Sequence, residues 1–130
     1  MYNHDILIGD CRGVDALVQE YTKHYEKVTV FFVGNSPRNF KNSQWKIKHV
    51  TNPLKKTGRD FYSLKDNSMS IDCDIAVMIW NGASIGTFNN IKNCETLNKD
   101  ILVFKRGTKI IKTTNNDLQN VFLKLFPDLN

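Results

Sequence analysis

The sequence predicts an α/β fold in which helices cover both faces of a mostly parallel sheet. Two short apolar runs, Ile6–Ile8 and Ile75–Ile79, have the composition of buried strands. Each run is followed by a glycine-containing turn and then by apolar residues at helical spacing. Apolar strands that alternate with helices are typical of a parallel sheet covered on both faces.

The overall composition predicts one soluble globular domain. The chain has 130 residues, of which 41% are hydrophobic and 24% are charged. It has no apolar run of the ~20 residues that span a membrane, and Met1 leads almost directly into a strand, so we expect no membrane partner and a cytoplasmic location. Three widely spaced cysteines without a CxxC pair indicate reduced thiols. The net charge of +5 favours anionic partners, either nucleotides or nucleic acid.

The stretch Trp80–Asn90 is the first candidate site. It joins an apolar strand to a helix through a glycine-rich turn. The N-terminus of a helix presents unpaired backbone N–H groups and partial positive charge, which suit a phosphate or a ribose. Gly82 and Gly86 would let a ligand approach the backbone, and Ser84 and Thr87 would add hydroxyl groups. The alternative is a plain turn in which Ser84 or Thr87 caps the helix.

The turn after the first strand is the second candidate site. Gly9 and Gly13 would make room for a phosphate or a sugar, Arg12 would supply positive charge, and Asp15 would bind a ribose hydroxyl. The alternative is that Asp10 or Asp15 simply caps the following helix. Apolar residues at helical spacing indicate that helix: Val14, Leu17, Val18, Tyr21 and Tyr25.

The remaining elements follow from local patterns. The β-branched and aromatic run Val28–Val33 predicts a strand, and Arg59–Ile71 predicts a helix. Ile101–Phe104 predicts a further strand, and Lys109–Lys112 predicts a short edge strand whose lysines discourage pairing. A last helix is expected after the cap candidates Asn115 and Asn116.

Between the second strand and the helix, the segment Arg38–Thr57 is predicted to be a long irregular loop. It is rich in lysine and includes Phe40 and Trp45. Long loops in compact domains are often lids or binding loops, and Arg38 or Trp45 could cover a base. The alternative is a solvated basic loop whose Trp45 packs on the core.

Two aspartates, Asp72 and Asp74, flank the start of the Ile75–Ile79 strand. Such a pair could bind a metal or act in acid–base chemistry, but it more often bounds secondary-structure elements. We therefore expect no metal site and no cofactor.

The run Gly9-Asp10-Cys11-Arg12-Gly13-Val14-Asp15-Ala16-Leu17 resembles the G-G-A-R-G-x-D-x-L turn of the SLOG superfamily. That superfamily comprises Rossmann-like domains related to DNA-processing protein A and to the "lonely guy" phosphoribohydrolases. The resemblance is to a small SLOG-like family of mostly uncharacterised bacterial and phage proteins, and it spans roughly Ile6 to Phe104. Further residues that carry it are Arg38, Asn39, Trp45, Lys65, Asp66, Met69, Asp74 and the stretch Met78–Asn90.

The resemblance implies a Rossmann-like three-layer fold with nucleotide-related ligands at the two glycine turns. Related proteins usually begin with an extra strand–helix unit that bears a G-S-R-like motif, and this chain lacks it. One sheet position is then expected to be unfilled. The resulting edge or apolar face could be covered by a second subunit, so we expect a homo-oligomer.

Asn90 is a departure from the phosphoribohydrolases, which carry a glutamate at this place. An amide cannot act as a carboxylate nucleophile or base. The leading hypothesis is therefore non-catalytic binding of a nucleotide or of a signalling ligand derived from NAD or a nucleotide. As SLOG domains in antiphage systems sense such signals, the resemblance implies a sensor or a phage-encoded sponge.

Three alternatives stay open. The chain could be a nucleoside 5′-monophosphate phosphoribohydrolase or another N-glycosidase, with Asp10 or Asp15, or else Asp66 or Asp74, as the carboxylate. It could bind single-stranded DNA like DNA-processing protein A, or it could have a purely structural or interaction role in which the glycine turns are mere turns. The predicted ligand-binding residues are Gly9, Asp10, Arg12, Gly13, Asp15, Arg38, Trp45, Trp80, Asn81, Gly82, Ser84, Gly86, Thr87 and Asn90.

Overall fold

The computed structural model describes residues 4–81, 83–105 and 108–113. Its contacts divide the chain into two compact units, Met1–Met69 and Ser70–Asn130, which we call the N-terminal unit and the C-terminal unit. The strands form two three-stranded sheets. The prediction of an α/β fold with mostly parallel strands is confirmed. That the chain is a single domain stays a prediction.

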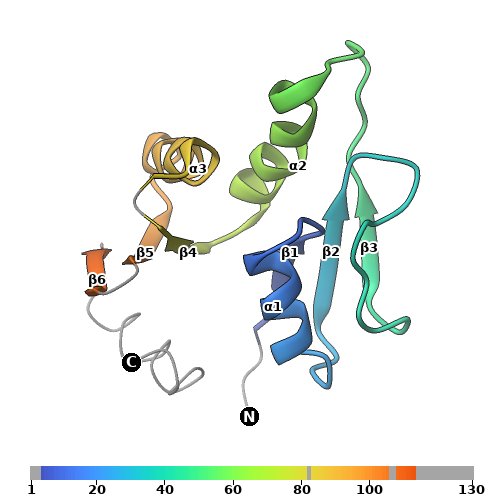
Figure 1. The fold of residues 1–130 in the computed structure, drawn as a ribbon, viewed down its shortest axis with the longest axis horizontal. Coiled ribbons are helices and arrows are strands. Elements are labelled where there is room, and N and C mark those ends of the chain that lie inside the picture. Colours follow the sequence, from blue (N-terminus) through green and yellow to red (C-terminus); the bar gives the residue numbers. More distant parts are fainter. Residues whose placement is uncertain (1–3, 82, 106–107, 114–130) are drawn as a thin grey trace. The chain divides into compact units, whose positions relative to one another are not determined.

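The N-terminal unit is built on three parallel strands. β1 (Ile6–Gly9), β2 (Val28–Phe32) and β3 (Lys46–His49) lie in this order, with β2 in the middle (Figure 1). α1 (Val14–Tyr21) joins β1 to β2, and α2 (Gly58–Asp72) follows β3. The carboxyl ends of parallel strands meet at one edge of a sheet, so the chain segments that follow β1 and β2 lie close together.

Buried β-branched residues of β1 and β2 form the core of the N-terminal unit. Val28 and Val30 of the middle strand are almost fully buried, as the β-branched pattern of this strand predicts. The core cluster consists of Ile8, Val28, Val30 and Trp45, with Ile6, Val18 and Tyr25 packed against it.

Two details of this unit differ from expectation. β3 lies inside the segment that was predicted to be irregular, and all its side chains are exposed. The apolar spacing correctly indicates α1, but Leu17 and Tyr21 are exposed and Gln19 is its fully buried residue. Apolar periodicity therefore located this helix without identifying the face that it buries.

The C-terminal unit contains β4 (Ile75–Trp80), α3 (Ile85–Thr96), β5 (Asp100–Lys105) and β6 (Thr108–Thr113). β5 lies between β4, to which it is parallel, and β6, to which it is antiparallel (Figure 1). The predictions of strands at Ile75–Ile79, Ile101–Phe104 and Lys109–Lys112, and of a helix between the first two, are confirmed. The core cluster consists of Ala76, Ile91, Cys94, Ile101 and Val103, with Cys73, Met78 and Trp80 packed against it.

The helix expected after Asn115 and Asn116 lies outside the described residues. Among the helices that the structure does describe, none has the length and apolar character needed to cross a membrane.

Candidate functional site

The turn between β1 and α1 packs charged side chains against the backbone. Gly13 is the N-cap of α1 with φ of 83°, a left-handed conformation that favours glycine. Asp15, in the first turn of α1, accepts a hydrogen bond from the Cys11 backbone N–H at 3.1 Å. At Gly9, an added Cβ would lie 2.9 Å from Lys65 Nζ and closer still to the Asp15 carboxylate. Any larger residue at this position would displace one or both of these charged groups from their observed positions.

Asp10 and Arg38 form the first charge pair of the site. The Arg38 guanidinium donates from Nη2 to Asp10 Oδ1 at 3.0 Å and from Nε to Oδ2 at 3.3 Å, and the Arg38 backbone N–H donates to Oδ2 at 2.9 Å. Asp10 is buried, whereas Arg38 is partly exposed. Burial alone would raise the pKa of Asp10, but the hydrogen bonds from Arg38 outweigh it and the pKa is lowered. Hydrogen bonding to Asp10 in turn raises the pKa of Arg38.

Lys65 of α2 is the centre of a second group of charges. Its ammonium group is buried, donates to Asp66 Oδ1 at 2.8 Å and lies 3.9 Å from Asp15 Oδ2. Burial on its own would lower the pKa of Lys65, but the charge and the hydrogen bond of Asp66 outweigh it and the pKa is raised. Burial raises the pKa of Asp15, although the positive charge of Lys65 opposes this. Asp15 is therefore easier to protonate than an ordinary aspartate.

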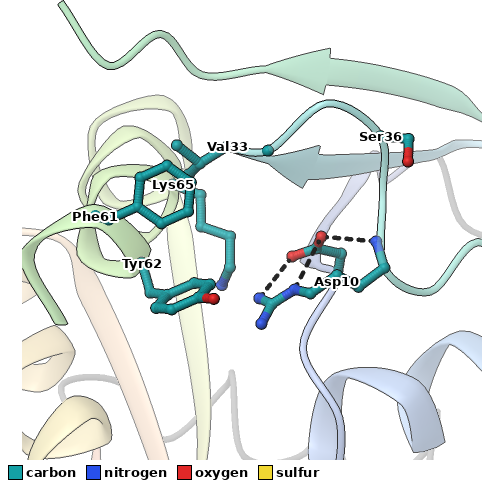
Figure 2. A pocket seen from close by; sticks show the side chains of 8 residues that line it. Asp10, Val33, Ser36, Phe61, Tyr62 and Lys65 are labelled. Carbon is teal, nitrogen blue, oxygen red and sulfur yellow. Dashed lines mark hydrogen bonds and ion pairs between the residues drawn. The ribbon is translucent and has the colours of Figure 1, made fainter. Parts of the chain in front are cut away.

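A small pocket of about 100 Å³ opens between these two groups of charges. Figure 2 shows Phe61, Tyr62 and Lys65 approaching it from α2, with Asp10 and Ser36 on the other side. The Arg38 guanidinium lies 4.7 Å from the centre of the Tyr62 ring, a cation–π contact. The pocket is smaller than the roughly 300 Å³ at which sites for complete drug-sized ligands begin, so it suits one chemical group of a larger ligand. Its lining residues are Asp10, Val33, Gly34, Ser36, Arg38, Phe61, Tyr62 and Lys65.

Hydrogen bonds from the side chains of Gln19 and Asn39 connect the chain segments around this pocket. The fully buried Gln19 donates from Nε2 to the carbonyl oxygens of Gly9, at 2.9 Å, and Asn39, at 3.1 Å. Asn39 Nδ2 donates to the carbonyl oxygens of Asp10, at 2.9 Å, and Cys11, at 3.0 Å. The two amides therefore join the turn after β1 to the segment that carries Arg38.

The sequence did not indicate Gln19 or Lys65 as site residues, and it indicated Asp66 only as one possible catalytic carboxylate. A signal for Gln19 exists, because Asp15 and Gln19 are four residues apart and so share one face of α1. Lys65 and Asp66 entered only through the family resemblance. The Asp15 carboxylate, which lies 3.9 Å from the Lys65 ammonium group, is distant in the chain, and no local pattern reveals this contact.

The second glycine turn belongs to the C-terminal unit, and its own side chains take up several backbone N–H groups. Asn81 Oδ1 accepts from the backbone N–H groups of Ala83 and Ser84, both at 2.8 Å. Ser84 is the N-cap of α3 and accepts from the Thr87 N–H at 3.4 Å. Trp80 Nε1 donates to the Ser84 carbonyl oxygen at 3.0 Å. These hydrogen bonds are typical of a capped strand-to-helix turn. They match the alternative given for this stretch, in which Ser84 or Thr87 caps the helix.

A role in ligand binding for the other residues of this turn stays a prediction. Gly86 faces open space, since an added Cβ would come no nearer than 4.0 Å to Ser84 Oγ. Asn90 is half-buried in α3. Gly82 lies outside the described residues.

The aromatic residues of the basic segment occupy different environments. Trp45 is 5% exposed, belongs to the core cluster and donates from Nε1 to the Tyr25 carbonyl oxygen at 2.7 Å. Phe40 is partly exposed and contacts Trp45 edge-on, with ring centroids 6.5 Å apart. The core position of Trp45 matches the structural alternative, in which this side chain packs inward and does not cover a base.

The structure thus brings a subset of the predicted residues together. Asp10 and Arg38 line the pocket, while Gly9 and Asp15 lie directly behind it. Arg12 is exposed on the same turn and does not line the pocket.

Comparison of the chain with protein-family models, with curated proteins and with solved structures found no match. Function is therefore inferred from the site itself.

Proposed function

We propose that the chain is a non-catalytic binding domain for a nucleotide-like small molecule, anchored at the pocket beside the turn after β1. The observation that carries this proposal is the buried ammonium group of Lys65 in the pocket wall. Among the described residues it makes one short hydrogen bond, to Asp66. An ammonium group has three donors, so Lys65 has capacity to bind an anionic oxygen of a ligand.

The mixed charge of the site suits a sugar phosphate better than a simple anion. Lys65 and Arg38 would hold phosphate oxygens, and the carboxylates of Asp10 and Asp15 would accept hydrogen bonds from sugar hydroxyls. Phe61 and Tyr62 offer aromatic surface at the same pocket, on which a base could lie. Together these groups match the chemistry of a nucleotide, of which the small pocket would hold one group while the rest of the ligand lies outside it.

The position of the pocket also favours ligand binding. Gly9 ends β1, and Val33 and Gly34 follow β2 at the carboxyl edge of the parallel sheet. Open α/β sheets bind ligands outside the carboxyl ends of their strands. The resemblance to SLOG domains extends the proposal to a signalling nucleotide, with the chain as a sensor or a sponge in antiphage immunity.

The same site offers one feature for a second candidate function, hydrolysis of an N-glycosidic bond. Burial raises the pKa of Asp15, which is the direction of shift that favours a general acid. Asp10, in contrast, is held ionised by Arg38 and is poorly suited to proton transfer. Hydrolysis of nucleoside 5′-monophosphates by the native protein, abolished by Asp15→Asn, would establish this second function.

The binding proposal is tested with ribose 5-phosphate and the common ribonucleoside 5′-monophosphates by titration calorimetry. We expect binding by the native protein, at least tenfold weaker binding by Lys65→Met and Tyr62→Ala, and unchanged binding by Lys46→Met on the exposed strand β3. Small molecules released by heat denaturation are identified in parallel by mass spectrometry. The proposal is wrong if the protein releases no nucleotide-like molecule and binds none of these probes. Tyr62 is partly exposed, so Tyr62→Ala keeps the test valid if Lys65→Met fails to fold.

A further inference from the structure

Two cysteines of the C-terminal unit lie beside the same serine. Cys94 is on the buried face of α3 and is 1% exposed, while Cys73 precedes β4 and is half-buried. The Cys94 Sγ lies 3.6 Å from the Ser70 Oγ, and the Cys73 Sγ lies 3.6 Å from the Ser70 carbonyl oxygen. Cys73 also packs against the core cluster that contains Cys94. The fold therefore places two thiols side by side, although 20 residues of the chain separate them.

The two thiols also interact electrostatically. A hydrogen bond from the Cys73 thiol lowers the pKa of Cys94 to about 6, against the effect of burial. The Ser70 hydroxyl and the positive charge of Lys99 act in the same direction. The hydrogen bond to Cys94 correspondingly raises the pKa of Cys73. The Lys99 ammonium is held near the pair by its hydrogen bond to the Ile71 carbonyl oxygen at 3.1 Å. Cys94 is therefore the more acidic of the two thiols.

We propose that Cys73 and Cys94 are a site of oxidative modification, at which hydrogen peroxide forms an intramolecular disulfide. The thiolate sulfur attacks one oxygen of the peroxide, the O–O bond breaks, and a sulfenic acid and hydroxide result. The sulfur of the second cysteine then displaces the sulfenic oxygen, the S–S bond forms, and the oxygen leaves as water after taking up the thiol proton. In sum, two thiols lose two electrons and two protons, and one peroxide molecule is reduced to two water molecules.

Cys11 provides a control within the same chain. It lies in the N-terminal unit, where the Arg38 guanidinium donates to its sulfur at 3.0 Å. It is the only cysteine in the sequence of the N-terminal unit. Peroxide can oxidise it, but it cannot form an intramolecular disulfide without breaking the Cys73–Cys94 pairing. The pairing pattern therefore distinguishes the proposed site from general thiol oxidation.

The test is peptide mapping of the intact protein after mild peroxide treatment and blocking of the remaining thiols with N-ethylmaleimide. Trypsin cleaves after Arg12, Lys65, Lys92 and Lys99, so each cysteine falls in a separate peptide. We expect peptide 66–92 joined to peptide 93–99, a loss of two hydrogen atoms from the intact mass, and reversal by dithiothreitol. Cys11→Ser should retain the cross-link, and Cys73→Ser should lose it.

Thermal unfolding supplies an independent readout. The oxidised native protein should melt at a higher temperature than the reduced protein, and Cys73→Ser should show no such increase. Cys73 is half-buried, so its replacement tests the proposal even if Cys94→Ser does not fold. Cross-links that involve only Cys11, or oxidation of Cys73 and Cys94 without a peptide joining them, would overturn the proposal.

Discussion

Asp10 and Arg38 are 28 residues apart in the chain and are joined by three hydrogen bonds, one from the Arg38 backbone and two from its guanidinium group. The backbone bond fixes where the segment after β2 passes the end of β1. The guanidinium bonds fix the direction of the side chain, which also lies over the Tyr62 ring. The Asp10 carboxylate thus positions two walls of the pocket. Its replacement should therefore lower both the stability of the fold and the affinity for a ligand.

Replacement of Asp10 by asparagine should remove stability in a pH-dependent manner. The pKa of Asp10 is lower in the folded protein than the 3.8 expected in the unfolded chain. The ionised carboxylate therefore stabilises the folded protein above pH 3.8, and this stabilisation is lost as the pH falls through the pKa of the folded protein. We expect Asp10→Asn to cost about 2–3 kcal/mol at pH 7, as for hydrogen bonds to charged groups. Urea unfolding of both proteins at a series of pH values measures this. A difference that stayed constant down to the acid limit would contradict the assignment.

Replacement of Asp15 by asparagine should have the opposite pH dependence. Burial raises the pKa of Asp15, so the folded protein holds this proton more tightly than the unfolded chain does. The Asp15 carboxyl therefore lowers stability progressively as pH rises from 3.8 to the folded value. We expect the stability of Asp15→Asn relative to the native protein to increase over that range. Asp5→Asn, at an exposed aspartate, controls for the loss of one charge, and a parallel pH profile for both variants would refute the expectation.

A methyl group at Gly9 should destabilise the fold, whereas one at Gly34 should leave the stability unchanged. The added Cβ of Gly9→Ala would press on the Asp15 carboxylate and lie 2.9 Å from Lys65 Nζ. At Gly34 the nearest atom would be the Ser36 carbonyl oxygen at 4.0 Å. We expect Gly9→Ala to destabilise the protein by about 1–3 kcal/mol, the usual cost of overpacking. Chemical denaturation compares the two variants, and equal midpoints would show that the side chains move aside freely.

Alanine at Gly86 should stabilise the protein. Gly86 lies in the first turn of α3, and an added Cβ would meet only Ser84 Oγ at 4.0 Å. Glycine costs about 0.5–1 kcal/mol relative to alanine in a helix, so Gly86→Ala should raise the free energy of unfolding by up to that amount. The thermal midpoint tests this. If the midpoint rises while nucleotide affinity falls, then Gly86 is kept as glycine for contact with a ligand.

The strands and helices could largely be predicted because their signals are local. Val28–Phe32 is β-branched and aromatic, and Ile91 and Cys94 recur at helical spacing on α3. β3 was missed because Lys46, Ile47 and Lys48 are all exposed and leave no alternation between core and solvent. Its strand conformation depends on pairing with β2, which is a non-local contact.

The site could be predicted only in part, because its contacts join distant segments. The glycine turn located Asp10 and Asp15, but not the partner of either carboxylate. Lysine is usually exposed on a helix. The Lys65 side chain is buried, and the carboxylates of Asp66 and Asp15 lie beside its ammonium group. Gln19 is buried for a similar reason, since its amide pairs with backbone groups that the sequence does not show to be near.

The pocket walls come from three stretches of chain, namely the turn after β1, residues 33–38 and the first half of α2. None of these stretches can form the pocket alone, so the pocket exists only after the N-terminal unit has folded. A ligand of the pocket therefore binds the native state and not the unfolded chain, and it shifts the unfolding equilibrium by mass action. At a free concentration 100 times its dissociation constant, such a ligand adds about 2.7 kcal/mol to the stability. A rise in melting temperature thus identifies a ligand of the native protein among compounds of any chemical class, and loss of that rise in Tyr62→Ala assigns the ligand to the pocket.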